Sequence, residues 1–331
     1  MTDAIYNNPY EGTTLFGFLM QILIRLWGFI NGSLSINDIA ADEVQMIVLI
    51  GVATSSALVG TFLILRRMTM LANSLSHTIL LGIVIAFLLT QGGVLESRDA
   101  HHNPIDIKVM LLAALCMSLM TAWLTEFFCK VTRLQEDAST GIVFTSLFAL
   151  GIVLVTMLTR NAHIGAEVVM GNVDALHLDD CKLVLVILGI NVVSFLIFFK
   201  EFKITTFDPN MSRALGISTV FFNYLLMTQV SATVVGAFRA VGVLMVLAFI
   251  TGPALMARLL THDLKRMLVL AVTIGCLSSI LGVALSRHLL SVYNLALSTG
   301  GVVVCTIVFL FLLTVIFTKL TQRLRNCEII S

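Results

Sequence analysis

Asn73 and His77 are the residues of this chain whose types and spacing could bind a metal ion. They are four positions apart, so on a helix both side chains lie on one face, about one turn from each other. An imidazole nitrogen and an amide oxygen suit Mn²⁺, Fe²⁺ and Zn²⁺, and this pair does not rank the three ions. A histidine within an apolar helix is costly and usually faces the bundle interior or a water-filled path. The alternative is that His77 only hydrogen-bonds to a neighbouring helix.

The elements that must position these two residues are membrane-spanning helices. The chain has 331 residues, of which 58% are hydrophobic and 12% charged, whereas soluble domains carry about 25% charged residues. Apolar runs of about 20 residues are long enough to cross a bilayer as helices. We therefore predict an all-α, polytopic membrane bundle of about nine or ten spans, forming a single membrane-embedded domain over residues 1–331. The expected spans are 13–34, 44–65, 71–90, 108–128, 139–158, 181–199, 214–234, 240–257, 267–287 and 296–318.

The first of these segments is the weakest candidate span, and residues 1–40 form an additional N-terminal segment. It contains Arg25 and could instead lie in the membrane interface with Trp27 as an anchor. If all ten segments cross with both termini in the cytoplasm, that side carries more than twice as many flanking Lys and Arg residues as the outer side. The positive-inside rule therefore predicts a cytoplasmic C-terminus. The other nine spans keep this orientation if the first segment lies on the surface.

Composition and missing motifs argue against several classes of protein. A net charge of +1 gives no bias towards nucleic acid, and the six cysteines are scattered without a CxxC pair, as expected for buried thiols. There is no Walker A pattern, so any ATP must be bound by another chain. A stand-alone secondary cation transporter would be expected to bury several carboxylates in its spans, and very few occur there. An intramembrane enzyme is not supported either, because no HExxH motif or pair of intramembrane aspartates is present.

Two groups of charged or metal-binding residues have an ordinary interpretation beside a functional one. Arg66 and Arg67 end an expected span on the cytoplasmic side, where they could anchor the helix or contact a nucleotide-binding partner. The two long outer loops could capture metal, although loop histidines are more often simply solvated. These loop histidines are His101, His102, His163 and His177.

Five segments, in this order along the chain, resemble the permease family of divalent-metal ABC importers, which carry manganese, zinc or iron. The first is similar to the family's LRRM…GDALSH signature, and the fourth to the cytoplasmic helix that docks on the ATPase. The resemblance covers roughly residues 40–320. The segments are LRRMTMLANSLSH (65–77), EDASTGIVF (136–144), MGNV (170–173), FDPNMSRALG (207–216) and VGVLMVLAFITGPA (241–254).

The resemblance implies a transport subunit, not an enzyme, that binds no tight cofactor and moves Mn²⁺, Zn²⁺ or Fe²⁺ across a bacterial inner membrane. The implied partners are an ABC ATP-binding subunit, a second permease of the same or a different chain, an extracytoplasmic metal-binding protein and membrane lipid, without nucleic acid. It places Asn73 and His77 on the transport path.

The resemblance also makes residues 205–218 the candidate cytoplasmic coupling helix. An aspartate followed by proline is a favourable helix start, which supports a short helix here. The alternative is an ordinary loop between two spans. The implied docking residues are Phe207, Asp208, Pro209, Ala214 and Gly216.

One position departs from the family pattern. The acidic residue four before the histidine is Asn73 here, and Ala72 replaces the glycine before it. Asparagine supplies a neutral oxygen where aspartate supplies a charged one, so we expect a partner chain to carry the missing carboxylate. A permease for a larger ligand, such as a siderophore or cobalamin, is the alternative function. The Ser76-His77 pair argues against that alternative.

Overall fold

The computed structural model describes residues 9–10, 12–31, 39–90, 107–133, 135–159, 173–176 and 178–330. Within these ranges the chain is helical and has no strand, which confirms the predicted all-α membrane bundle. Nine of the described helices are long and apolar enough to cross a bilayer. The elements are α1 (Leu15–Ile30), α2 (Ala41–Leu65), α3 (Thr69–Thr90), α4 (Ile107–Thr132), α5 (Glu136–Thr159), the 3-10 turn η2 (Val173–Ala175), α7 (Leu178–Ile197), α8 (Phe199–Phe207), α9 (Pro209–Ala214), α10 (Thr219–Val241), α11 (Val243–Leu260), α12 (Leu264–Tyr293) and α13 (Thr299–Ile330).

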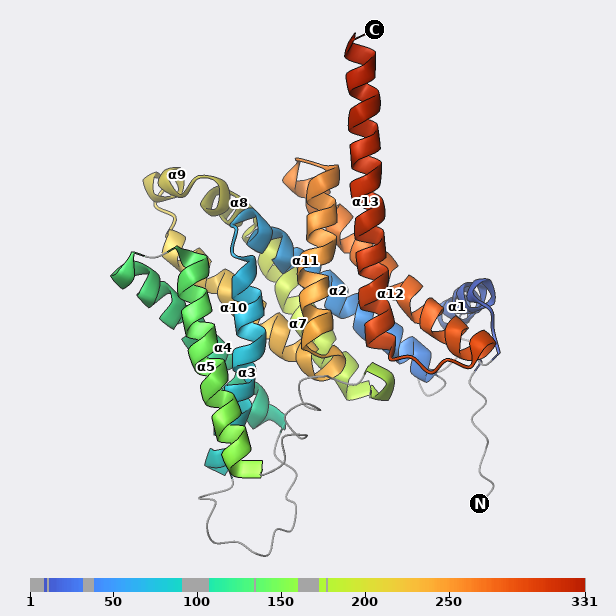
Figure 1. Cartoon of the computed structure of the whole chain (residues 1–331), viewed down its shortest axis with the longest axis horizontal. Helices are drawn as coiled ribbons and strands as arrows, with labels where there is room; N and C mark the ends of the chain where they lie inside the picture. The colour runs from blue at the N-terminus through green and yellow to red at the C-terminus, as the bar shows by residue number, and fades with distance from the viewer. Residues whose placement is uncertain are drawn as a thin grey trace, which may run out of the picture.

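The bundle has two distinct ends, shown in Figure 1. The short helices α8 and α9 lie at the same end as the C-terminus of α13, and we call this the docking end. Helix α1, the start of α2 and the start of α13 lie towards the other end, which we call the opposite end. Long helices such as α2 therefore run from one end of the bundle towards the other.

Helix α2 is the central helix of the bundle. It packs against α7, α10, α11 and α12, and most of its residues are buried. Gly60 permits close contact with α11, because a Cβ atom there would lie 2.0 Å from the carbonyl oxygen of Ile250. Near the middle of α2, the Asn191 amide donates to Ser55 Oγ (2.6 Å) and to Thr233 Oγ1 (2.7 Å). Close packing and interhelical hydrogen bonds of this kind hold a bundle together in lipid.

Helix α3 packs between α4 and α5. A Cβ atom at Gly82 would lie 2.8 Å from Met117 Cγ, so α3 and α4 approach closely there. The hydroxyl of Thr121 on α4 donates to Thr78 Oγ1 over 3.0 Å. These contacts fix one face of α3 on α4 and determine the direction in which its other residues point.

Helix α1 is shorter than the span expected over residues 13–34. It has 16 residues, whereas a span needs about 20, and it packs chiefly against α12. Its one charged residue, Arg25, turns towards α2. This arrangement favours the interfacial alternative. The exposed side chains of α1 are all apolar at Phe16, Met20, Leu23, Ile24, Leu26 and Trp27.

The expected spans 214–234 and 240–257 correspond to two helices, α10 and α11. Helices α10 and α11 are separate, and Gly242 between them has a φ of 82°. Glycine adopts this left-handed conformation without the steric cost that a side chain imposes. Arg239 lies in the last turn of α10, and its side chain is outside the described part of the chain.

Candidate functional site

Asn73 and His77 lie on α3, on a stripe that the rest of the chain only partly covers. Met70 is exposed and the other two are half-buried. Between them, Ser74 and Ser76 are buried in the bundle. Neither Asn73 nor His77 has a side-chain hydrogen-bond partner among the described residues. The sequence alternative, that His77 only hydrogen-bonds to another helix, therefore receives no support within this part of the chain.

Two phenylalanines of α5 position the imidazole of His77. Its ring centroid lies 5.4 Å from that of Phe144 and 5.2 Å from that of Phe148. The two phenylalanine rings, one turn apart, stack on each other at 5.7 Å. Such ring contacts restrict the orientation of the imidazole without using either nitrogen as a donor or acceptor. The unprotonated nitrogen of the imidazole could therefore bind a metal ion.

Asn73 and His77 do not make a complete metal site. Among the described residues, no group of three or more His, Cys, Asp or Glu side chains could hold a metal ion. Even a tetrahedral zinc site uses about four ligands. The half-exposed stripe supplies two at most, and its exposure leaves space beside it for ligands from another chain.

The segment 205–218 contains the helix start that the sequence predicts. Asp208 caps α9, since its Oδ1 accepts hydrogen bonds from the backbone N–H groups of Asn210 (3.1 Å) and Met211 (2.9 Å). Pro209 follows at the first helical position, where its missing N–H costs nothing. The alternative of an ordinary loop is therefore wrong for residues 209–214.

Gly216 ends this short helix. Its φ is 75°, and its N–H donates to Arg213 O over 3.1 Å. The N–H of Ile217 donates to Ser212 O over 2.9 Å. This pair of bonds is the Schellman ending, in which glycine is favoured at the left-handed position. Asp208, Pro209 and Gly216 thus define the two ends of α9, and Ala214 is exposed in its last turn.

Two exposed apolar residues of the docking end were missed by the sequence analysis. Phe207, Met211 and Leu215 are 59%, 54% and 56% exposed. Met211 and Leu215 lie one turn apart on α9, and Phe207 ends α8 just before the non-helical Asp208. We call these three exposed residues the apolar stripe. Phe207 was predicted as a docking residue, whereas Met211 and Leu215 were not. Their separation by four residues in an otherwise polar segment was the sequence pattern that could have predicted them.

Arg66 and Arg67 behave differently although they are adjacent. The guanidinium of Arg66 turns inward and donates three hydrogen bonds to side chains of α8 and α10. Arg67 is exposed and has a φ of 62°. Their N–H groups and that of Met68 close the C-terminal turn of α2. The sequence suggested either a helix anchor or a contact with a nucleotide-binding partner. Neither interpretation includes the inward hydrogen bonds of Arg66.

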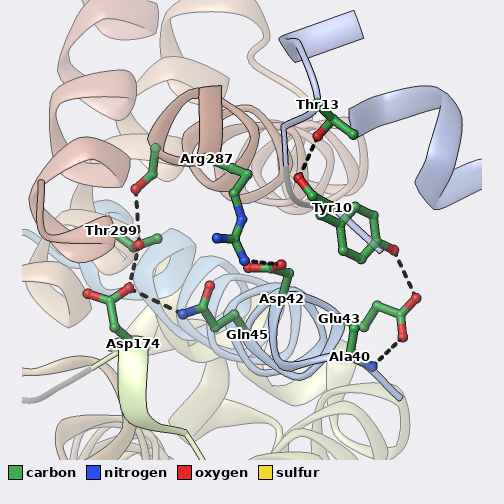
Figure 2. Close-up of polar contacts among 10 residues, drawn as sticks. Tyr10, Thr13, Ala40, Asp42, Glu43, Gln45, Asp174, Arg287 and Thr299 are labelled. Carbon is green, nitrogen blue, oxygen red and sulfur yellow. Dashed lines mark hydrogen bonds and ion pairs between the residues drawn. The ribbon is translucent and has the colours of Figure 1, made fainter. Parts of the chain in front are cut away.

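A buried carboxylate links three segments at the opposite end. Figure 2 shows Glu43 accepting from the Tyr10 hydroxyl (2.8 Å) and from the backbone N–H of Ala40 (2.9 Å). Arg25 of α1 also forms an ion pair with it over 2.5 Å. Burial and the neighbouring Glu43 carboxylate raise the pKa of Tyr10 above its ordinary value of 10.0. These contacts attach α1 and the residues before it to the start of α2.

A second polar group lines a cavity of about 280 Å³ beside this carboxylate. Asp42 forms an ion pair with Arg287 of α12 (Figure 2). Asp174 of η2 accepts from Gln45 (3.2 Å) and from the Thr299 hydroxyl (2.5 Å). The starts of α2 and α13 and the end of α12 are therefore joined by charged and polar contacts at this end.

The comparisons with known proteins agree with this arrangement of helices. The model of the ABC 3 transport family matches residues 43–318. The chain belongs to the ABC 3 transport family. A probable metal transport system membrane protein of Chlamydia muridarum is 38% identical over 305 residues, covering 92% of this chain and 93% of that protein. The manganese transport system membrane protein MntD of Bacillus subtilis is 38% identical over 248 residues, covering 71% of this chain and 79% of that protein.

A solved structure supports the same family assignment. The structure described as PsaBC from Streptococcus pneumoniae in complex with Fab aligns with a TM-score of 0.68 at 26% identity. The alignment covers 87% of this chain and 95% of that chain. The permease fold predicted from the sequence is thereby confirmed.

The family match also separates the site from the N-terminal segment. The matched region of this ABC 3 transport family member includes Asn73, His77 and the whole of α8 and α9. Helix α1 lies before its first residue. Several predicted features fall outside the described residues, and these are the outer-loop histidines His101, His102, His163 and His177 and the segment 170–172.

Proposed function

We propose that this chain is the permease subunit of an ATP-driven importer for divalent metal ions, with Asn73 and His77 on the path of the ion. The observation that carries the proposal is the half-exposed stripe of α3, where an amide and an imidazole have no partner among the described side chains. Polar residues in spans are costly unless they serve a path or a neighbour. The names of the relatives support a metal as cargo, and manganese is the first ion to test.

A second permease would complete this path. The described part of one chain supplies two neutral ligands here. Further ligands would come from water, from the extracytoplasmic metal-binding protein, or from a second permease, the same or a different chain, facing α3. A carboxylate on that partner would supply the charge that Asn73 lacks. A weak site shared between two chains also favours release, because moving the chains apart divides its ligands.

The docking end supplies the contact with an ATP-binding subunit. The apolar stripe formed by Phe207, Met211 and Leu215 would enter a groove on that subunit, which carries out ATP hydrolysis. An extracytoplasmic metal-binding protein would deliver the ion at the opposite end. In this proposal the chain lies in a bacterial inner membrane with its C-terminus in the cytoplasm. ATP then changes the relative populations of two arrangements of the bundle.

Metal uptake into proteoliposomes tests the proposal. The vesicles contain this chain with the ATP-binding subunit and any second permease encoded beside it, and the binding protein is added outside. We expect Mn²⁺ uptake that requires ATP. Zn²⁺ or Fe²⁺ should inhibit this uptake if they bind the same site. An assembled complex that hydrolyses ATP without taking up any of these ions would contradict the proposal.

A further inference from the structure

Arg66 joins the docking end to the helices of the transport path. It caps the C-terminus of α2, and its guanidinium donates to Thr206 Oγ1 (3.1 Å) and Thr205 Oγ1 (3.0 Å) in the last turn of α8. Its third bond goes to Asn223 Oδ1 on α10 over 3.1 Å. A planar guanidinium presents donors in several fixed directions, so one side chain can hold three acceptors on two helices.

The acceptors on α8 are themselves held in place. Thr205 is buried, and its hydroxyl donates to the carbonyl oxygen of Glu201 over 2.8 Å. The lone pairs of that hydroxyl remain free to accept from Arg66. The threonine hydroxyl is therefore a donor to Glu201 and an acceptor from Arg66. The guanidinium also lies at the C-terminal turns of both α2 and α8, where a positive charge is stabilised by the helix dipoles.

Helix α8 passes any displacement of α9 directly to these threonines. One residue, Asp208, separates the two helices, and it ends α8 while capping α9. Its N–H donates to Ile204 O over 2.9 Å, and its carboxylate accepts from two N–H groups of α9. With hydrogen bonds on both sides of the junction, α9 cannot move far without moving Thr205 and Thr206.

The chain that follows Arg66 continues into α3, which carries Asn73 and His77. The N–H of Arg67 donates to Ile64 O (3.1 Å) and that of Met68 to Leu63 O (2.9 Å), so α2 ends in a tight hydrogen-bonded turn. Helix α3 begins at Thr69. The turn therefore leaves no flexible linker between the residue that binds α8 and the helix that carries the half-exposed stripe.

We propose that Arg66 is the positioning residue that transmits movement of the docking helices α8 and α9 to α2 and α3. This inference rests on the proposed function, in which an ATP-binding subunit moves α9. Removing the three hydrogen bonds of the Arg66 guanidinium should leave the apolar stripe intact. Movement of the ATP-binding subunit should then no longer displace α2 and α3. Transport and ATP hydrolysis should then become uncoupled.

The test compares Arg66→Lys with Arg67→Lys in the assembled proteoliposome complex. Lysine keeps the charge but cannot span the three acceptors, and Arg67 is the exposed neighbour that makes no such bonds. We expect Arg66→Lys to retain the ATP-binding subunit and to hydrolyse ATP, while metal uptake per ATP falls by about tenfold or more. Arg67→Lys should behave as the wild type. Wild-type uptake per ATP in Arg66→Lys, or loss of the ATP-binding subunit from it, would overturn the inference.

A second pair of substitutions guards against misfolding of the arginine variant. Thr205→Val with Thr206→Val removes the acceptors on α8 at nearly constant volume and should produce the same uncoupling. Fully coupled transport in this double variant would count against Arg66 acting through α8.

A measurement that does not depend on the cargo separates this inference from the proposed function. Spin labels at Asn210 of α9 and Ile47 of α2, both exposed, are placed in a cysteine-free chain within the complex. With and without ATP, the distance between them should stay constant in the wild type and change or broaden in Arg66→Lys. Equal behaviour of the two proteins would overturn the role of Arg66, whereas absence of metal uptake by the wild type would contradict only the proposed cargo.

Discussion

Arg66 and Arg67 show how much neighbouring residues of one type can differ. Arg67 occupies the left-handed position that usually holds glycine at the end of a helix, at a cost of roughly 1–2 kcal/mol for a residue with a side chain. Because of that backbone turn, Arg66 points to α8 and Arg67 points to solvent. The same logic applies to α3, where the direction of each side chain decides which polar residues stay unpartnered.

Replacing Asn73 by aspartate should restore the ligand type that the family signature contains. A carboxylate adds a charged oxygen one turn from His77, so the apparent affinity for Mn²⁺ should increase by about tenfold, or about 1.4 kcal/mol. Release should slow, and maximal uptake should fall. Metal titration of uptake rates in Asn73→Asp measures both effects. Asn73→Leu should show the reverse trend in affinity, and equal affinities in the two variants would rule out a ligand role for this residue.

Tyr10 should make the attachment of α1 sensitive to alkaline pH. Its pKa is raised by burial and by Glu43, so the attached state holds the phenol proton more tightly than the detached state. The stabilisation is therefore present below a pH of about 10 and is lost as the pH rises above it. In Trp123→Phe, Trp27 is the only remaining tryptophan, and its emission should change above that pH. Adding Tyr10→Phe should remove this transition, and a transition that persists would assign it to another group.

At the scale of elements, short helices depend on their ends and on the surface they present. Helix α9 has only six residues, too few to be stable alone. Its aspartate cap, its proline and its glycine ending hold it in place at the end of the bundle. Asp208, Pro209 and Gly216 therefore stabilise this helix, whereas Phe207, Met211 and Leu215 form the exposed apolar stripe.

The exposed stripe should control binding of the ATP-binding subunit. Burying an apolar side chain contributes about 1.5–3 kcal/mol, so Met211→Ser with Leu215→Ser should weaken that binding on the order of 100-fold. The matched control is Val292→Ser with Leu295→Ser, which removes two exposed apolar residues at the opposite end. Affinity measured by titration in detergent or nanodiscs should fall only in the first variant. Equal affinity in both would exclude the stripe from the contact.

Helix α1 should lie in the membrane interface with its apolar face in lipid. Its only charge is paired with Glu43, and Trp27 lies on the exposed face, where an indole favours the headgroup region. In Trp123→Phe, lipids brominated near the headgroup should quench Trp27 more strongly than lipids brominated near the chain ends. Stronger quenching by the deep label would indicate a spanning helix, and no quenching would indicate that protein covers this face. Either result would contradict the interfacial position.

Hydropathy and local capping rules were sufficient for the nine long apolar helices of the described chain and for the start of α9. They were not sufficient for the first expected span, 13–34, where α1 has only 16 residues. Hydropathy and capping both depend on residues close together in sequence. The partners of Glu43 and Asp42 could not be predicted in this way. Arg25 is 18 positions from Glu43 and Arg287 is 245 positions from Asp42, so each pairing depends on how the helices pack. The inward turn of Arg66 was missed for the same reason.

At the scale of the whole molecule, the central helix α2 connects two polar clusters. At the opposite end, Asp42 and Glu43 attach it to α12 and α1, and at the docking end Arg66 attaches it to α8 and α10. Its middle is packed against four other helices. Because α2 is held at both ends and along its length, we expect it to move as a unit in the proposed transport cycle.

The most direct test of the account is ATP-dependent Mn²⁺ uptake by His77→Ala, with His288→Ala as the matched histidine control. His288 lies on α12 and accepts the N–H of Leu15 at 3.2 Å, away from α3. The account predicts that His77→Ala assembles and hydrolyses ATP but loses uptake by about tenfold or more. His288→Ala should transport at the wild-type rate. Wild-type uptake by an assembled His77→Ala complex would contradict the assignment of the α3 stripe to the path of the ion.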